Sequence, residues 1–69
     1  MKYYYEYKEK NGAKVGGHNL EDITIKNNTI ILEGTDYLKK NYEIYDMPWQ
    51  DILNPKEIEY IKIEPMEEE

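Results

Sequence analysis

The sequence predicts a small, mainly β domain: an antiparallel β-barrel or highly curved sheet with one short helical turn. Apolar and polar residues alternate along residues 2–8 and place Tyr3, Tyr5 and Tyr7 on one face. Two further alternating segments flank Asn27-Asn28. The last apolar segment, residues 58–64, is rich in Ile and Tyr, which favour strands. A chain of 69 residues has room for one hydrophobic core only, so we expect a single domain.

The central hairpin is predicted from its turn and its register together. Asparagine tolerates the left-handed conformation, so Asn27-Asn28 is typical of a two-residue hairpin turn. This turn pairs Ile25 with Ile30 and Ile23 with Leu32, and it puts all four side chains on one face. A shift of one residue would scatter them over both faces. We therefore expect the hairpin to lie at the centre of the fold.

Glycines divide the chain on both sides of this hairpin. Gly16-Gly17 is expected to interrupt the chain and to leave residues 13–15 as a weak strand or loop edge. Gly34-Thr35-Asp36 is expected to end the hairpin, and residues 42–45 then form another short strand.

Two segments near the C-terminus carry helical signals. Residues 47–53 have Pro48 at a first helical position, which predicts one short helical or 3₁₀ turn. Residues 54–57 resemble a second helix start with a cap. Residues 58–64 match a strand or a short helix, and we favour a strand because of their Ile and Tyr content. Pro65 is expected to end the domain, which spans residues 1–65, and residues 66–69 form a disordered acidic tail.

This order of elements is similar to that of SH3-like and Sm-like barrels. The similarity is one of architecture and implies no function. The alternative fold is an α+β arrangement, in which a sheet packs against one C-terminal helix.

Charge and composition narrow the classes of function. The net charge is −6, and since residues 1–26 hold five lysines and four acidic residues, the negative charge lies in the remainder. Arginine is absent, and no basic face is expected, so direct nucleic-acid binding is disfavoured. The chain has neither a signal-like apolar start nor a run of about 18 apolar residues, so we expect a cytoplasmic protein without membrane contact.

The side chains needed for catalysis are scarce. Serine and cysteine are absent, which excludes a hydrolase triad within this chain. The single histidine, His18, follows the glycine pair, and a loop histidine without a fixed partner is its favoured interpretation. The acidic pair Glu21-Asp22 lacks the alternating oxygen ligands of a calcium loop. We therefore expect no enzyme, no catalytic residue, no metal site and no cofactor.

Tyrosine is over-represented, with eight residues and no phenylalanine. Most of these rings are expected to pack the core, and those near turns are expected to contact a partner through an apolar body and a polar tip. Trp49 is expected either to fill the core beneath the short helical turn or to act as an exposed anchor. The predicted partner-binding residues are Asp36, Tyr37, Glu43, Tyr45, Asp46, Trp49 and Asp51.

In size and charge, the chain resembles small acidic inhibitors that phages make against host nucleases and defence enzymes. The resemblance implies a non-enzymatic protein-binding module that occupies a basic surface on a nucleic-acid-handling enzyme. Three alternatives stay open. The surplus acid keeps a small protein soluble and nothing more; the chain is a structural subunit of a larger complex; or it sequesters a small molecule or nucleotide. In the last case Gly16-Gly17, His18 and nearby tyrosines form the pocket at a homo-oligomer interface.

Overall fold

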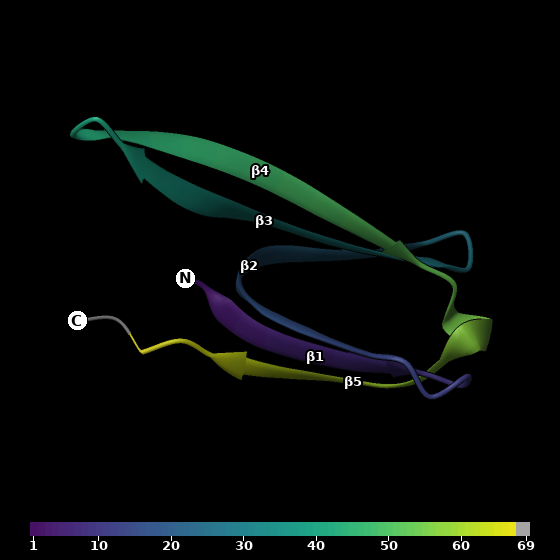
Figure 1. The fold of residues 1–69 in the computed structure, drawn as a ribbon. Coiled ribbons are helices and arrows are strands. Elements are labelled where there is room, and N and C mark those ends of the chain that lie inside the picture. Colours follow the sequence, from purple (N-terminus) through teal and green to yellow (C-terminus); the bar gives the residue numbers. More distant parts are fainter. Residues whose placement is uncertain (68–69) are drawn as a thin grey trace.

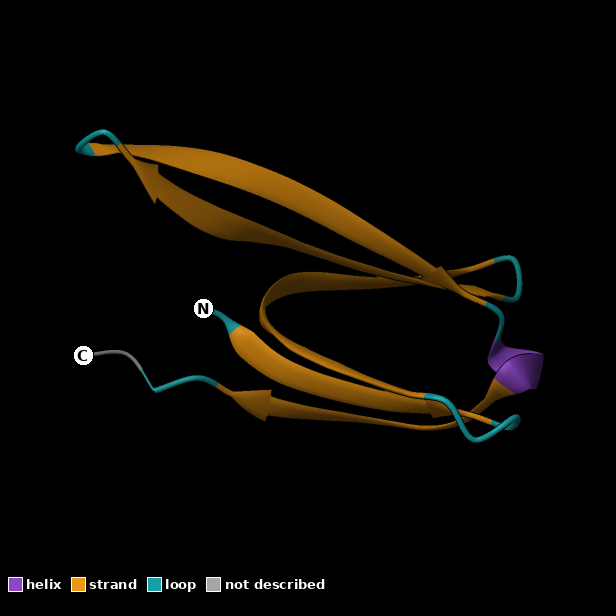
Figure 2. Ribbon diagram, viewed as in Figure 1, coloured by secondary structure: helices purple, strands orange, loops and turns teal. Residues whose placement is uncertain are grey.

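The computed structural model describes residues 1–67, which form one five-stranded antiparallel sheet in the order β4-β3-β2-β1-β5. Figures 1 and 2 show that strands make up most of the chain and that a single 3₁₀ turn joins β4 to β5. The prediction of a mainly β protein is confirmed. The elements are β1 (Tyr3–Glu9), β2 (Lys14–Lys26), β3 (Thr29–Lys40), β4 (Glu43–Leu53), the 3₁₀ turn η1 (Pro55–Glu57) and β5 (Ile58–Pro65).

The predicted barrel or highly curved sheet is wrong, because the sheet is neither closed nor strongly curled, and its bend is local to β2. Its edges are β4 and β5, and within the described residues these two strands do not pair with each other. The long pairing of β3 with β4, from Ile30–Leu53 to Lys40–Glu43, instead extends past the other strands and gives overall dimensions of 43 × 22 × 21 Å. The alternative fold with a C-terminal helix is also wrong, because residues 58–65 form β5.

The central hairpin has the predicted turn and register. Asn27 and Asn28 have φ values of 51° and 57°, so both adopt the left-handed conformation that a two-residue turn of this kind needs. Ile25 pairs with Ile30, and Ile23 pairs with Leu32.

The sheet bends across β2, which turns midway so that β1 and β5 lie opposite β3 and β4 (Figure 1). Asn19 has a φ of 63° at this point. The pairing of β2 shifts register on both sides, once against β1 and once between Leu20 and Asp22 against β3. Such bulges add an unpaired residue and bend the strand locally. The bend therefore brings side chains of β1 and β4 to face each other.

The core lies between these two parts of the sheet. Its buried side chains come from four different strands and are Tyr7, Leu20, Leu32 and Leu53. Ile30 packs against this cluster, whereas Ile25 is 74% exposed although it shares the predicted apolar face. The core is thus smaller than the apolar face of the central hairpin.

Three local predictions are wrong because strand pairing overrides the local signals. Gly16-Gly17 lies inside β2, opposite Tyr5 and Glu6 of β1. Gly34-Thr35-Asp36 continues β3, because Gly34 lies beneath the Trp49 ring and does not form a turn. Residues 47–53 belong to β4, an edge strand, where a proline is tolerated because its missing N–H can face away from the ladder.

The segment after β4 follows its sequence signals. The Asn54 side chain caps η1 by accepting a hydrogen bond of 3.1 Å from the Lys56 backbone N–H. Pro65 is the last residue of β5, and the Met66 N–H donates to the Lys2 carbonyl at 2.9 Å. The disordered acidic tail at 66–69 stays a prediction, and its last two residues lie outside the described part of the chain.

Candidate protein-binding surface

The outer half of the β3–β4 hairpin projects beyond the sheet. We call residues 35–48 the hairpin arm. The pairing of β3 with β2 ends at Gly34, so in the described structure the strands of the arm pair only with each other. Figure 1 shows this part of β3 and β4 extending away from the η1 end of the molecule.

The hairpin arm is apolar on both of its faces. Alternation along the paired strands puts Leu38 and Tyr45 on one face, and it puts Tyr37 and Ile44 on the other. All four side chains are exposed, as is Met47. A hairpin that only meets water usually carries polar side chains on its solvated face. Apolar exposure of this kind is typical of a surface that contacts another molecule.

The tip of the arm holds a tyrosine in an unfavourable backbone conformation. Asn41 and Tyr42 form the turn, with φ values of 52° and 64°. Asparagine enters this left-handed region readily, whereas a tyrosine there costs about 1 to 2 kcal/mol. Tyr42 is 99% exposed, so no packing within the described chain offsets that cost. Sequence reasoning placed Tyr42 inside a strand, although the polar run Lys39-Lys40-Asn41 before it was a turn signal.

The seven predicted contact residues all lie on β3 and β4, but the structure divides them between two faces. Asp36, Glu43, Tyr45, Trp49 and Asp51 share the face that continues into the core, and Tyr37 and Asp46 are paired on the opposite face. The Tyr45 hydroxyl donates to Glu43 Oε2, and this hydrogen bond raises the pKa of Tyr45. Lys2 Nζ donates to the Tyr37 hydroxyl at 2.8 Å, which ties the arm to the N-terminus of β1.

A hollow of about 340 Å³ lies at the base of the arm, where β1 and β2 face β3 and β4. It joins two groups of residues that the sequence had suggested for different functions. The predicted small-molecule pocket contributes Gly16, Gly17, His18 and Tyr5 to the lining, and the predicted contact set contributes Asp36, Trp49 and Asp51.

Two aromatic rings form the apolar wall of this hollow. The ring centroids of Tyr5 and Trp49 lie 5.4 Å apart, with 32° between the ring planes. Each ring also lies over a glycine. A Cβ on Gly17 would be 2.7 Å from the Tyr5 hydroxyl oxygen, and one on Gly34 would be 2.5 Å from the Trp49 indole and closer still to the Asn19 carbonyl. The rings take these positions because neither glycine has a side chain.

The hollow is electronegative. Burial raises the pKa of Tyr5, and the charges of Asp51 and then Asp36 raise it further. The pKa of the deeper Tyr7 is also raised, first by burial and then by Asp51. Asn19 Nδ2 donates to Asp36 Oδ1 at 3.2 Å, and the residues that line the hollow include no lysine. The site therefore disfavours phosphate and other anions.

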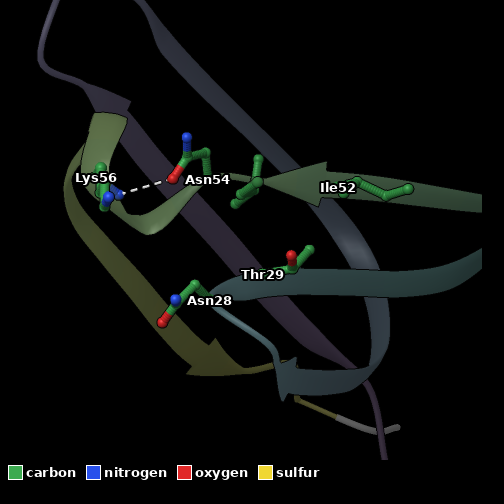
Figure 3. Close-up of a pocket in the computed structure, with 6 residues that line it drawn as sticks. Asn28, Thr29, Ile52, Asn54 and Lys56 are labelled. Atoms are coloured by element: carbon green, nitrogen blue, oxygen red, sulfur yellow. Dashed lines mark hydrogen bonds between the residues drawn. The ribbon is translucent and has the colours of Figure 1, made fainter.

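A second hollow, of about 390 Å³, lies at the opposite end of the molecule, beside the Asn54 cap (Figure 3). It is bounded by Asn28, Thr29, Ile52, Leu53, Asn54 and Lys56. Its lining combines two amides, a hydroxyl, one lysine and aliphatic carbon, and the Asn54 side chain is already engaged in the cap. This combination points to no specific chemistry.

Neither a metal site nor a membrane-spanning helix is found within residues 1–67. No group of three or more His, Asp or Glu side chains is placed to hold a metal ion. None of these residues belongs to a helix of the length and apolar character needed to cross a membrane.

Comparison of the chain with protein-family models, curated proteins and solved structures finds no match.

Proposed function

We propose that this protein is a non-enzymatic binding module whose hairpin arm contacts a basic surface on a partner protein. The observation that carries the proposal is the arm itself, which exposes apolar side chains on both faces and packs against no other described strand over most of its length. Contact with a partner would cover this surface.

Aromatic side chains supply the contact area. Tyrosine and tryptophan dominate binding energy at interfaces, because they bury a large surface with few rotatable bonds. Tyr37, Tyr42 and Tyr45 are exposed on the arm, and Tyr42 keeps its position at the tip despite its left-handed backbone. A residue held in a strained, fully exposed conformation is a candidate for function.

Carboxylates give the proposed contact surface its negative charge. Asp36, Glu43 and Asp46 lie on the arm, and Asp51 lies beyond its base. Lys39-Lys40 gives the tip some positive charge beside Glu43, so most of the carboxylates of the proposed contact lie nearer the base. Complementary charge mainly speeds association and selects the partner, whereas the buried rings set how slowly the complex dissociates.

The proposed partner is a nucleic-acid-handling or defence enzyme with a basic groove. In this arrangement carboxylates occupy the positions of phosphates, and exposed rings occupy those of bases. The support for this is the small size, the net charge of −6 and the aromatic content of the arm. The lack of arginine disfavours direct binding to nucleic acid.

The test is affinity capture from a lysate of the source organism with the wild-type protein and with a variant that carries Tyr42→Ala and Tyr45→Ala. The matched control is Ile25→Ala, which also truncates an exposed apolar side chain but lies outside the arm. We expect one protein to be retained by the wild type and the control, to be lost from the double variant, and to elute as salt rises. Equal retention by all three proteins would contradict the proposal.

A small-ligand function is the second candidate, because residues suggested for a pocket do line one hollow. The two carboxylates argue against a nucleotide as its ligand, since both would repel phosphate.

A further inference from the structure

We propose that the hollow at the base of the hairpin arm binds the cationic end of a lysine or arginine side chain from the partner protein. That the cation comes from a partner protein depends on the proposed function. That the hollow binds such a cation does not depend on it, and this binding can be measured on the free protein.

The aromatic wall is suited to the aliphatic stem of a basic side chain. Lysine and arginine lay their methylene groups along apolar surface and keep the charged end in a polar environment. Tyr5 and Trp49 meet at the hollow with their centroids 5.4 Å apart. Each ring packs on a glycine and against the other ring, and these contacts hold both rings in the free protein. Fixed groups lose little entropy on binding.

Two carboxylates flank the same wall. Trp49 pairs with Gly34, so Asp51 lies two residues along β4 on the same face, and Asp36 lies two residues along β3. Both line the hollow, and their charges reach Tyr5, whose pKa they raise. Asp36 holds one hydrogen bond from Asn19, which leaves its second carboxylate oxygen for a ligand. A charged donor placed here would form charge-assisted hydrogen bonds as well as ring contacts.

The shape of the hollow favours a long side chain over a free metal ion. Asp36, Asp51 and His18 all line the hollow, but among the described residues no three such side chains are placed closely enough to hold a metal ion. A volume of about 340 Å³ takes the end of a lysine or arginine together with water. The hollow also adjoins the arm, so a partner held by the arm could insert one basic side chain without a second interface.

The fluorescence of Trp49 tests this directly, because it is the only tryptophan in the chain. The free protein is titrated with Nα-acetyl-arginine methyl ester and Nα-acetyl-lysine methyl ester at constant ionic strength. The neutral control is the citrulline analogue, which has nearly the shape of arginine without its charge. We expect a weak, saturable response to both cations and none to citrulline.

Variants assign the response to the hollow. Asp36→Asn and Asp51→Asn should each weaken cation binding about tenfold, the usual effect of losing a charged hydrogen-bond partner. Glu33→Gln is the matched control, because it removes the same charge from the opposite face of β3, where it pairs with Gln50. Circular dichroism confirms that each variant is folded.

Three outcomes would overturn the inference: an equal response to citrulline, no saturable response in folded wild-type protein, or equal losses in Glu33→Gln and the two aspartate variants. Failure of the proposed function is separate from these. If cations bind in the hollow but Tyr42→Ala with Tyr45→Ala leaves capture unchanged, the arm proposal fails and cation binding by the hollow stands. If capture depends on the arm but not on Asp36 or Asp51, the partner does not supply the cation, and the inference fails alone.

Discussion

Tyr5 of β1 and Trp49 of β4 are in ring contact although β2 and β3 lie between their strands in the sheet. Neighbouring strands lie about 4.8 Å apart, so a flat sheet would hold these two strands about 14 Å apart. Figure 1 shows that β2 bends, and this bend, where Asn19 is left-handed and the pairing shifts register, removes that separation. It thereby closes the core over Leu20 and Leu32, and it forms the hollow at the base of the hairpin arm.

The first prediction concerns the glycines beneath these rings. Gly34→Ala and Gly17→Ala should each lower the free energy of unfolding by about 2 to 3 kcal/mol, because the new Cβ overlaps the Asn19 carbonyl and the Trp49 ring at position 34 and the Tyr5 ring at position 17. Gly16→Ala is the matched control. Its Cβ would meet only the Tyr5 carbonyl at an ordinary 3.5 Å, so its effect should stay within about 0.5 kcal/mol. Urea unfolding measures all three, and equal effects would show that the rings do not rest on the glycines.

The second prediction separates two isoleucines that are paired across the central hairpin. Ile30→Ala should cost about 2 kcal/mol, because Ile30 packs against the core. Ile25→Ala should cost less than about 0.5 kcal/mol, because that side chain is 74% exposed. The measurement is again the free energy of unfolding in urea. A large loss at Ile25 would mean that another surface covers it in solution.

The third prediction concerns the tip of the arm. Tyr42→Gly should raise the free energy of unfolding by up to about 1 kcal/mol, because glycine adopts a φ of 64° without strain. The same variant should weaken partner binding. Asn41→Gly, at the neighbouring turn position, should change both quantities little. Stronger or unchanged binding by Tyr42→Gly would remove Tyr42 from the contact.

The fourth prediction is a loss of stability at alkaline pH. The folded state raises the pKa of Tyr5 and Tyr7 above the ordinary value of 10.0. Above pH 10 the folded protein therefore holds protons that the unfolded chain has released. The contribution is fully present below pH 10 and is lost as the pH rises through the folded-state pKa values.

Asp51 contributes to both shifts, after burial. Asp51→Asn should therefore make the fall of Tm with pH shallower above pH 10, and Glu33→Gln should leave the slope unchanged. Thermal unfolding followed by circular dichroism across the alkaline range measures both slopes. A slope that is equal in wild type and Asp51→Asn would show that Asp51 does not act on these tyrosines.

The central hairpin could be predicted from the sequence because its local and long-range signals agree. Asn27-Asn28 sets the turn, and the same register aligns Ile25 with Ile30. The strand at 58–65 and the Asn54 cap were predicted on similarly local grounds. In each of these cases the pattern that fixes the element lies within a few residues.

The hairpin arm could not be predicted, because the residues that explain Gly34 and Pro48 lie elsewhere in the fold. Gly34 was interpreted as the end of a strand, yet it lies within β3, where both the Asn19 carbonyl and the Trp49 ring approach it too closely for a side chain. Pro48 was interpreted as a helix start, yet β4 is an edge strand. The seven predicted contact residues all lie on β3 and β4, and their division between two faces follows from a strand pairing that was not predicted.

The hollow at the base of the arm could not be predicted from the sequence either. Gly16, Gly17 and His18 were assigned to one hypothesis, and Asp36, Trp49 and Asp51 to another. Only the bend in β2 brings the two groups together. Gly16-Gly17 beside the bend was interpreted as an interruption of the chain and not as a bend within one strand, and the left-handed Asn19 lies in a strand and not in a turn.

A shortened hairpin arm tests the central claim most directly. In this variant residues 38–45 are replaced by Asn-Gly, so that Tyr37 and Asp46, already a cross-strand pair, flank a two-residue turn. The core residues Tyr7, Leu20, Leu32 and Leu53 all lie outside the deleted segment. The measurement is the affinity for the captured partner, made alongside the free energy of unfolding. We predict a free energy of unfolding within about 1 kcal/mol of wild type, together with loss of detectable binding. A folded variant that binds its partner as tightly as the wild type would contradict the claim that the arm is the binding surface.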